Sequence, residues 1–378
     1  MNRNPVKILI AGDFCPHNRV ETLARNKDFG TIFNDFLNVF QENDLKIVDL
    51  ECPLTLSDSE RIKTGPHQRA HPDCIHVLKY ADVGLVALAN NHIMDYGYSG
   101  VSDTLRLCSE HFIDTTGVGR TVDEAAKPFM RVFKEKKIAV FNFADDEFIK
   151  APDNSFVCNR LDPIQAFYGI KEYRNVADYI IVIVHAGNEF YSLPSPRTRK
   201  LYRFLVDSGA DVIVANHTHA FSGYEVYNTR PIFYGLGNFI YDHPGRCDSS
   251  WNTGFAVRLL FSDKIDFELI PLKQNNKMPG VFHLNKDEDL HFKKEISRLN
   301  DIIADPEKLQ QEFDKYCEQV SDMYDSFLEP YFGRIITALR VRKLFPKLIS
   351  KRKRMLLLNL FRCESHREVM VRLLEDFE

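Results

Sequence analysis

The sequence has no long apolar run. Near the N-terminus, uninterrupted apolar residues extend only from Ile8 to Ala11. A secretory signal needs about 7–15 consecutive apolar residues, and a membrane-spanning helix needs about 20. The sequence therefore predicts neither element. It favours a cytoplasmic protein, free or held peripherally at the inner face of the membrane.

Regular cysteine spacing, internal repeats and low-complexity segments are also lacking. The eight cysteines include no Cys-x-x-Cys pair, which favours reduced thiols over a disulfide framework. The net charge of -4 gives no overall case for nucleic-acid binding. With 378 residues, 44% of them hydrophobic, the chain can bury a large core and support a smaller appendage.

Strand patterns alternate with helical patterns over most of the chain, and a glycine-rich loop is expected at 235–239. Strands are predicted at 7–13, 46–51, 83–89, 112–115, 131–133, 137–143, 178–185, 211–214, 225–227, 231–234, 254–261 and 265–271. Helices are predicted between them at 35–40, 72–80, 95–109, 163–174 and 196–208. This order is typical of an α/β domain with antiparallel edges.

Polar side chains with ligand or acid–base chemistry recur where the predicted strands end. They are Asp13, Glu51, Asn91, His92, His185, His217 and His219. Ligands bind outside the carboxyl ends of strands in such sheets, and imidazole is a common ligand of first-row metals. We therefore expect one joint polar or metal site. For the His217–His219 pair alone, two loop histidines with ordinary hydrogen bonds remain the alternative.

Three further residues are candidates for contacting a substrate or supporting the ligands: Arg69, Glu189 and Asn238. Arg69 could clamp an anion or be a surface arginine. Glu189 could face the substrate or be a solvated loop carboxylate. Asn238 could bind substrate, although capping its own loop is the favoured interpretation.

The composition changes towards the C-terminus. Residues 284–378 lack strand patterns and predict helices at 288–304, 306–324, 327–344 and 345–377, the last with possible breaks. This indicates an α-helical extension that follows a domain at 6–272. Within the extension, residues 339–361 carry eight cations and no acidic residue, interleaved with leucines. The segment could pack on the domain, lie on an anionic membrane or, less favoured without an aromatic platform, bind nucleic acid.

Co-sedimentation with anionic vesicles separates these alternatives for 339–361. Each cation near an anionic surface contributes about 1 kcal/mol. An attached protein is therefore expected to pellet with the vesicles at low salt and to be released when Lys351–Arg354 are neutralised. A chain that stays in the supernatant at low salt would leave this segment a structural role alone.

Six motifs occur in order along the chain. They are Gly12-Asp13, Asp49-Leu-Glu-Cys-Pro-Leu-Thr55, Leu88-Ala-Asn-Asn-His-Ile-Met-Asp-Tyr-Gly97, His185-Ala-Gly-Asn-Glu-Phe190, Gly209-Ala-Asp-Val-Ile-Val-Ala-Asn-His-Thr-His219 and Tyr234-Gly-Leu-Gly-Asn-Phe239. Over roughly residues 6–272 the chain resembles the CapA (PGA_cap) family of bacterial capsule and poly-γ-glutamate biosynthesis proteins. That family is similar in fold to calcineurin-like metallophosphoesterases, which implies a four-layer αββα sandwich.

The resemblance also implies roles for the matched residues. It implies metal ligands at Asp13, Glu51, Asn91, His185, His217 and His219, with Glu51 in the bridging position and His92 as the general acid. The implied cofactors are two divalent metal ions, Mn, Fe or Zn. The sequence departs from the phosphoesterase pattern at Cys15, where His is usual, at Glu51, where Asp is usual, and at Asn216, where Gly is usual.

The implied function is a metal-dependent hydrolase that cleaves a phosphoester or amide bond during capsule, exopolysaccharide or poly-γ-glutamate synthesis. Its expected partner is the polymer or a phosphoester substrate. The alternative is a non-catalytic assembly subunit of a membrane-associated polymer synthase. Metal content separates the two, because the subunit needs no bound metal.

Overall fold

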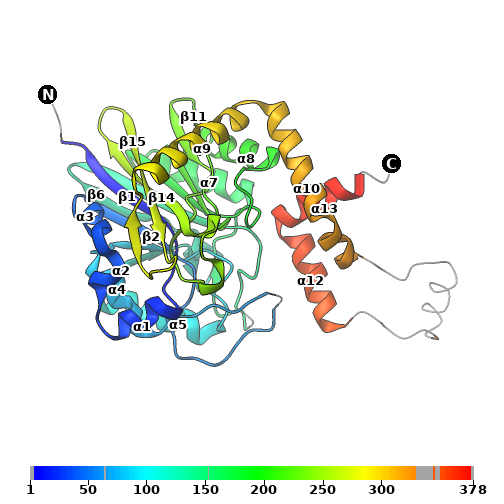
Figure 1. Ribbon diagram of the computed structural model, residues 1–378, viewed down its shortest axis with the longest axis horizontal. Helices are drawn as coiled ribbons and strands as arrows, with labels where there is room; N and C mark the ends of the chain where they lie inside the picture. Colours follow the sequence, from blue (N-terminus) through cyan, green and yellow to red (C-terminus); the bar gives the residue numbers. More distant parts are fainter. Residues whose placement is uncertain (1–3, 64, 152, 329–343, 345–349, 376–378) are drawn as a thin grey trace.

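Two β-sheets pack face to face, and helices cover their outer faces, in the computed structural model (Figure 1). The structure describes residues 4–63, 65–151, 153–328, 344 and 350–375. It confirms the α/β class and the four-layer αββα arrangement.

The first sheet has eight strands in the order β16-β15-β14-β1-β2-β3-β4, and β13 pairs with the end of β1. The strands are β1 Val6–Cys15, β2 Leu45–Leu50, β3 Leu85–Ala87, β4 Asp114–Thr116, β13 Asn238–Tyr241, β14 Thr253–Phe261, β15 Ile265–Gln274 and β16 Val281–His283. Strands β1 to β4 are parallel, so their carboxyl ends share one edge. The sequence predicted only a loop at 235–239, because β13 is defined by its pairing with β1.

The second sheet has the order β11-β12-β10-β9-β7-β6. Its strands are β6 Phe129–Phe133, β7 Lys136–Ala144, β9 Tyr179–His185, β10 Val212–Asn216, β11 Tyr224–Tyr227 and β12 Arg230–Phe233. Strands β7, β9 and β10 are parallel. Two short strands, β5 Val118–Gly119 and β8 Val157–Cys158, form a separate pair.

Successive side chains of β1 point to opposite faces of the first sheet and so pack into different layers. Ile8 and Ile10 face the second sheet, whereas Leu9 and Ala11 face helices. The helices on the side of the first sheet are α1 Asn18–Arg25, α2 Phe29–Phe33, α3 Leu37–Gln41, α4 Ile75–Tyr80 and α5 Gly97–Glu110. Helix α6 Val122–Ala126 packs on β5 and β8. On the second sheet lie α7 Pro163–Arg174 and α8 Pro196–Asp207. Each buried Val, Leu or Ile contributes about 1.5–3 kcal/mol, which is what holds the layers together.

The C-terminal helices continue from this body (Figure 1). They are α9 Lys286–Ala304, α10 Pro306–Leu328, α12 Lys351–Arg362 and α13 Glu364–Glu375. Phe292 and Ile296 of α9 are buried in the core between the sheets. Helices α10, α12 and α13 share their own cluster, which includes Phe313, Leu360 and Val369. The proposed boundary between 272 and 284 stays a prediction.

The basic segment 339–361 is described only in part, because 339–343 and 345–349 lie outside the described residues. Its membrane contact stays a prediction. Over the part of the chain that the structure describes, no helix is both long and apolar enough to cross a membrane.

Candidate metal centre

Six of the seven predicted strand-end residues converge in one buried cluster, and the seventh, His92, lies beside it. The six are Asp13, Glu51, Asn91, His185, His217 and His219, none more than 7% exposed. They come from β1, from the segments after β2 and β3, from β9 and from the turn after β10. Both sheets therefore contribute to the cluster through the carboxyl ends of their parallel strands.

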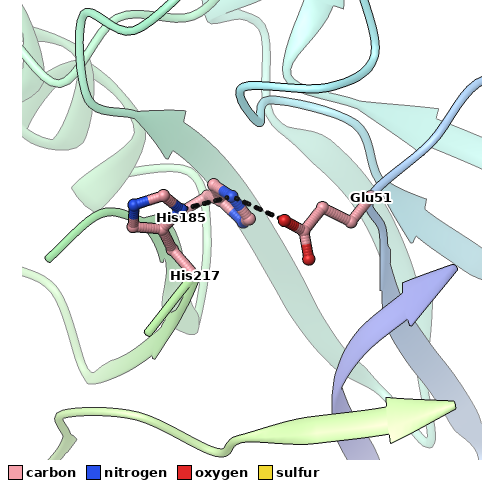
Figure 2. Close-up of side chains that lie close together, drawn as sticks. All are labelled: Glu51, His185 and His217. Carbon is pink, nitrogen blue, oxygen red and sulfur yellow. Dashed lines mark hydrogen bonds and ion pairs between the residues drawn. The ribbon is translucent and has the colours of Figure 1, made fainter. Parts of the chain in front are cut away.

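His185 lies between His217 and Glu51 (Figure 2). Its Nδ1 is 2.8 Å from Asp49 Oδ2, and its Nε2 is 3.0 Å from Asn91 Oδ1, 3.1 Å from His217 Nδ1 and 3.7 Å from Glu51 Oε1. When Asp49 is ionised it can only accept hydrogen bonds, and its contact then places the proton of His185 on Nδ1. The lone pair of Nε2 then faces Glu51, Asn91 and His217, as a metal ligand requires.

Asp49 was not among the predicted site residues. It is 1% exposed, and Asn90 Nδ2 donates to its Oδ1 at 3.3 Å. Burial raises the pKa of Asp49 well above its usual value, and the charge of Asp13 raises it further. Side chains two apart on a strand share a face, so the Asp49-Leu-Glu51 spacing was the signal available in the sequence.

The turn after β10 is held in an unusual backbone conformation. His217 has φ 94° and His219 has φ 54°, in the left-handed region. Each such residue costs about 1–3 kcal/mol and persists only when its surroundings impose it. Asp13 imposes part of it, because both its carboxylate oxygens lie 3.3 Å from the backbone nitrogen of His217. The strain directs both imidazoles into the cluster.

Asn238 orients His219. Its Oδ1 is 3.0 Å from His219 Nδ1, and its Nδ2 donates to the carbonyl of Trp251 at 3.1 Å. Asp13 Oδ2 also lies 3.3 Å from His219 Nδ1. Burial acts to lower the pKa of His219, but the hydrogen bond and charge of Asp13 outweigh it and raise the pKa. Asn238 therefore supports a predicted ligand in addition to ordering its loop.

A close approach of two backbones places Asp13 and Asn238 side by side. A Cβ on Gly12 would lie 1.8 Å from the carbonyl oxygen of Gly237, and Gly237 itself has φ 73°. Only glycine permits this contact. The Gly12-Asp13 motif and the glycine-rich motif before Asn238 therefore meet in one backbone contact, which places the side chains of Asp13 and Asn238 next to each other.

Glu51 provides the test of whether these residues fit a cation. Both its carboxylate oxygens are buried without a hydrogen-bond partner among the described residues, and the imidazole nitrogens of His185 and His219 lie 3.7 and 3.6 Å from Oε1. Burial, with the charges of Asp13 and Asp49, raises the pKa of Glu51 well above its usual value. An unpaired buried carboxylate is costly, and a bound cation removes that cost.

The donor set also fits. Three overlapping groups have ligand atoms within 4.8 Å of one another: Asp13–Asp49–His185, Asp13–Glu51–His219 and Glu51–His185–His217. Carboxylate oxygen and imidazole nitrogen are the donors that Zn, Mn and Fe sites use. The two groups that contain Glu51 are candidate sites for divalent metal ions, whereas in the Asp13–Asp49–His185 group Asp49 Oδ2 contacts His185 Nδ1 and orients that ligand.

His92 lies beside the cluster in a separate contact chain. Its Nδ1 is 2.7 Å from Asp95 Oδ2, and Asp95 Oδ1 is 2.5 Å from Lys63 Nζ, whose side chain is 2% exposed. Burial lowers the pKa of His92, and the charge of Lys63 lowers it further. Asp95 lies within a quoted motif, but nothing in the sequence marked Lys63, which belongs to a polar loop.

The two remaining predicted residues lie outside this chain of contacts. Arg69 pairs with Asp58 at 2.8 Å and lies over the ring of Tyr96, so it is not brought to the cluster. Glu189 is exposed and lies in the loop after His185. Burial and the charges of Asp13 and Asp49 raise the pKa of Glu51, and the charge of Glu189 raises it further, so Glu189 lies near the cluster. Among the described residues it forms no hydrogen bond or ion pair with a predicted ligand.

Glu147, which the sequence did not single out, connects the cluster to the C-terminal helices. Its Oε2 is 4.0 Å from His217 Nε2, and its Oε1 is 3.6 Å from His366 Nε2. Asn359 Nδ2 of α12 donates to Oε1 at 2.8 Å. The neighbouring Asp145 accepts from the backbone nitrogens of Glu364 and Ser365 at the start of α13. Helices α12 and α13 therefore pack against the segment 145–147, next to the cluster.

Comparison with known proteins supports the resemblance. The sequence model of the family described as "Bacterial capsule synthesis protein PGA_cap" matches residues 7–243. The PGA biosynthesis protein CapA of Bacillus subtilis (strain 168) is 28% identical over 315 residues, which cover 79% of this chain and 83% of that protein. The capsule biosynthesis protein CapA of Bacillus anthracis is 27% identical over 243 residues, 62% of this chain and 59% of that protein.

Among solved structures, a putative 5'-nucleotidase from Staphylococcus aureus in complex with alpha-ketoglutarate aligns with a TM-score of 0.44 and 14% identity. The alignment covers 78% of this chain and 58% of that one. A score of this size carries no argument about function. The family match spans more than half of the chain and contains every predicted ligand. The chain therefore belongs to the bacterial capsule synthesis PGA_cap family.

Proposed function

We propose that this protein is a metal-dependent hydrolase of capsule or poly-γ-glutamate synthesis and that it cleaves a phosphoester or amide bond. The observation that supports it most is Glu51, a fully buried carboxylate without a hydrogen-bond partner among the described residues, surrounded by histidines. A purely structural carboxylate at this position would be expected to have hydrogen-bond partners. Relatives named for capsule and PGA biosynthesis supply the biological context.

The residues that would hold the cations are Asp13, Glu51, Asn91, His185, His217 and His219, with Asp49 orienting His185. When bound, divalent cations supply Lewis-acid stabilisation of the negative charge that develops in phosphoester or amide hydrolysis. Two ions, chosen from Mn, Fe and Zn, match the two ligand groups that overlap at Glu51. Asp13 adds a second carboxylate to offset their charge.

His92 would move the proton. Asp95 Oδ2 lies 2.7 Å from His92 Nδ1, and Lys63 Nζ lies 2.5 Å from Asp95 Oδ1 and 3.1 Å from the same His92 Nδ1. This arrangement leaves Nε2 to exchange a proton with the leaving group. Burial and Lys63 keep the imidazole neutral before substrate binds, because both lower its pKa. A negatively charged substrate beside Nε2 favours the protonated form, which is the form that a general acid needs.

Metal analysis followed by a substrate screen tests this proposal. The purified chain is expected to retain Mn, Fe or Zn, and the reconstituted protein is expected to hydrolyse a member of a panel of phosphoesters and γ-glutamyl peptides. Chelation should stop turnover, and the same metal should restore it. A chain that binds none of these metals after reconstitution would instead support the assembly-subunit alternative.

A further inference from the structure

A cavity of about 490 Å³ separates the metal-site loops from the C-terminal helices. One wall, which we call the metal-site loops, is formed by residues 61–62, 146, 148–150 and 160, and the other by residues of α12 and α13. The second wall lies beyond residue 243, where the family match ends. The cavity is therefore built jointly by the shared domain and by the C-terminal extension of this chain.

Cations dominate its lining. Of the thirteen lining residues, five are Arg or Lys and one, Asp146, is acidic. Arg160 pairs with Asp146 at 3.4 Å, and Arg367 pairs with Glu364. Among the described residues, Arg61, Lys150 and Arg362 form no ion pair. Three of the five cations thus lack an acidic partner across the described walls.

Arg61 shows that this charge is partly withdrawn from water. Its Nε is buried with no hydrogen-bond partner among the described residues, although its Nη1 donates to the carbonyl of Phe148. Leaving a guanidinium nitrogen buried and unpaired is unfavourable unless a ligand pairs with it. Arginine is the side chain best suited to carboxylate or phosphate, since its planar fork can form two parallel hydrogen bonds.

The cavity adjoins the metal centre. Asn359 lines it and donates to Glu147, whose other oxygen lies 4.0 Å from His217 Nε2. On the opposite side, Arg61 is two residues before Lys63, which pairs with Asp95 next to His92. A chain-like ligand with its reacting bond at the metal centre could therefore extend into this cavity.

Apolar side chains stand between the cations. Phe148, Leu358 and Phe361 line the same cavity, and the guanidinium of Arg61 lies 5.2 Å from the ring centre of Phe148. A polyphosphate has no apolar atoms to place against them. A polycarboxylate chain with methylene groups between its charges matches both the cations and the apolar surface.

The geometry points to this cavity as the binding site for a polycarboxylate segment of the substrate, held between the metal-site loops and helices α12 and α13. This inference rests on the proposed function for the identity of the ligand as substrate. The binding event itself needs no metal and no turnover, so it is tested independently.

Binding of a fluorescent γ-linked glutamate decamer to the full chain tests the cavity. Replacing one arginine of the lining, Arg362→Gln, removes one charged hydrogen-bond donor and is expected to weaken binding about 3–10-fold at low salt. Arg160→Gln, on the opposite wall, is expected to act in the same direction. Arg354→Gln is the matched control, because Arg354 lies exposed on the same helix and outside the cavity lining.

The outcomes separate the two proposals. Binding that is weakened by Arg362→Gln and Arg160→Gln but kept in Arg354→Gln supports the site, whether or not the protein hydrolyses anything. Equal loss in all three variants, or no loss in any, would overturn it. A decamer of phosphate that binds as tightly as the glutamate decamer would refute the polycarboxylate assignment and leave a general anion site.

Discussion

His217→Ala is expected to release the metal and remove all measurable turnover. His217 lies 3.1 Å from His185 and belongs with Glu51 and His185 to one candidate ligand group. Loss of a residue that only supports a ligand costs about 10–100-fold in metal affinity, so loss of the ligand itself should exceed that range. Metal content after dialysis and titration with Zn or Mn would measure it.

Two comparisons make this result specific. Asp49→Asn removes the carboxylate that orients His185 but leaves the proposed ligands in place, so it is expected to weaken metal binding about 10–100-fold without abolishing it. His291→Ala, an exposed histidine on α9, should change nothing. If His217→Ala keeps full metal affinity while it remains folded by circular dichroism, His217 is not a ligand.

His92→Ala is expected to keep the metal and lose most turnover. A lost general acid or base costs about 10²–10⁴-fold in rate. His92 hydrogen-bonds Asp95, and the only other side chain within hydrogen-bond distance of its ring among the described residues is Lys63, so the ligand cluster should survive its removal. Metal content and turnover measured on the same preparation would separate the two effects.

The pH profile adds a second readout for the same contact chain. Lys63 lowers the pKa of His92, so Lys63→Met is expected to raise that pKa and move the basic limb of the rate profile towards higher pH. Metal content should stay unchanged. Loss of metal from His92→Ala equal to that from His217→Ala would show that His92 is itself a ligand.

Local sequence was sufficient to place the proposed ligands. Asp13, His185 and His217 each follow an apolar run that could be recognised as a buried strand. His185 and His217 follow neighbouring parallel strands and therefore share one sheet edge, whereas Asp13 ends up beside them only because its own sheet packs face to face on theirs. The uninterrupted apolar run at the start of the predicted strand 7–13 fits its burial on both faces, between the second sheet and the helices. The α/β class and the family follow from these same segments.

Only the tertiary structure determined which distant side chains contact the residues of the site. Asp49 meets His185 across 136 residues of sequence, and Glu147 meets Asn359 across 212. Strand β13 exists only because Gly12 and Gly237 let two backbones approach, a contact that no local pattern encodes. Hydrophobic periodicity specifies which face of an element is buried, but not which distant element covers it. For that reason the sequence predicted a helical extension without revealing that α12 and α13 enclose a cationic cavity beside the metal centre.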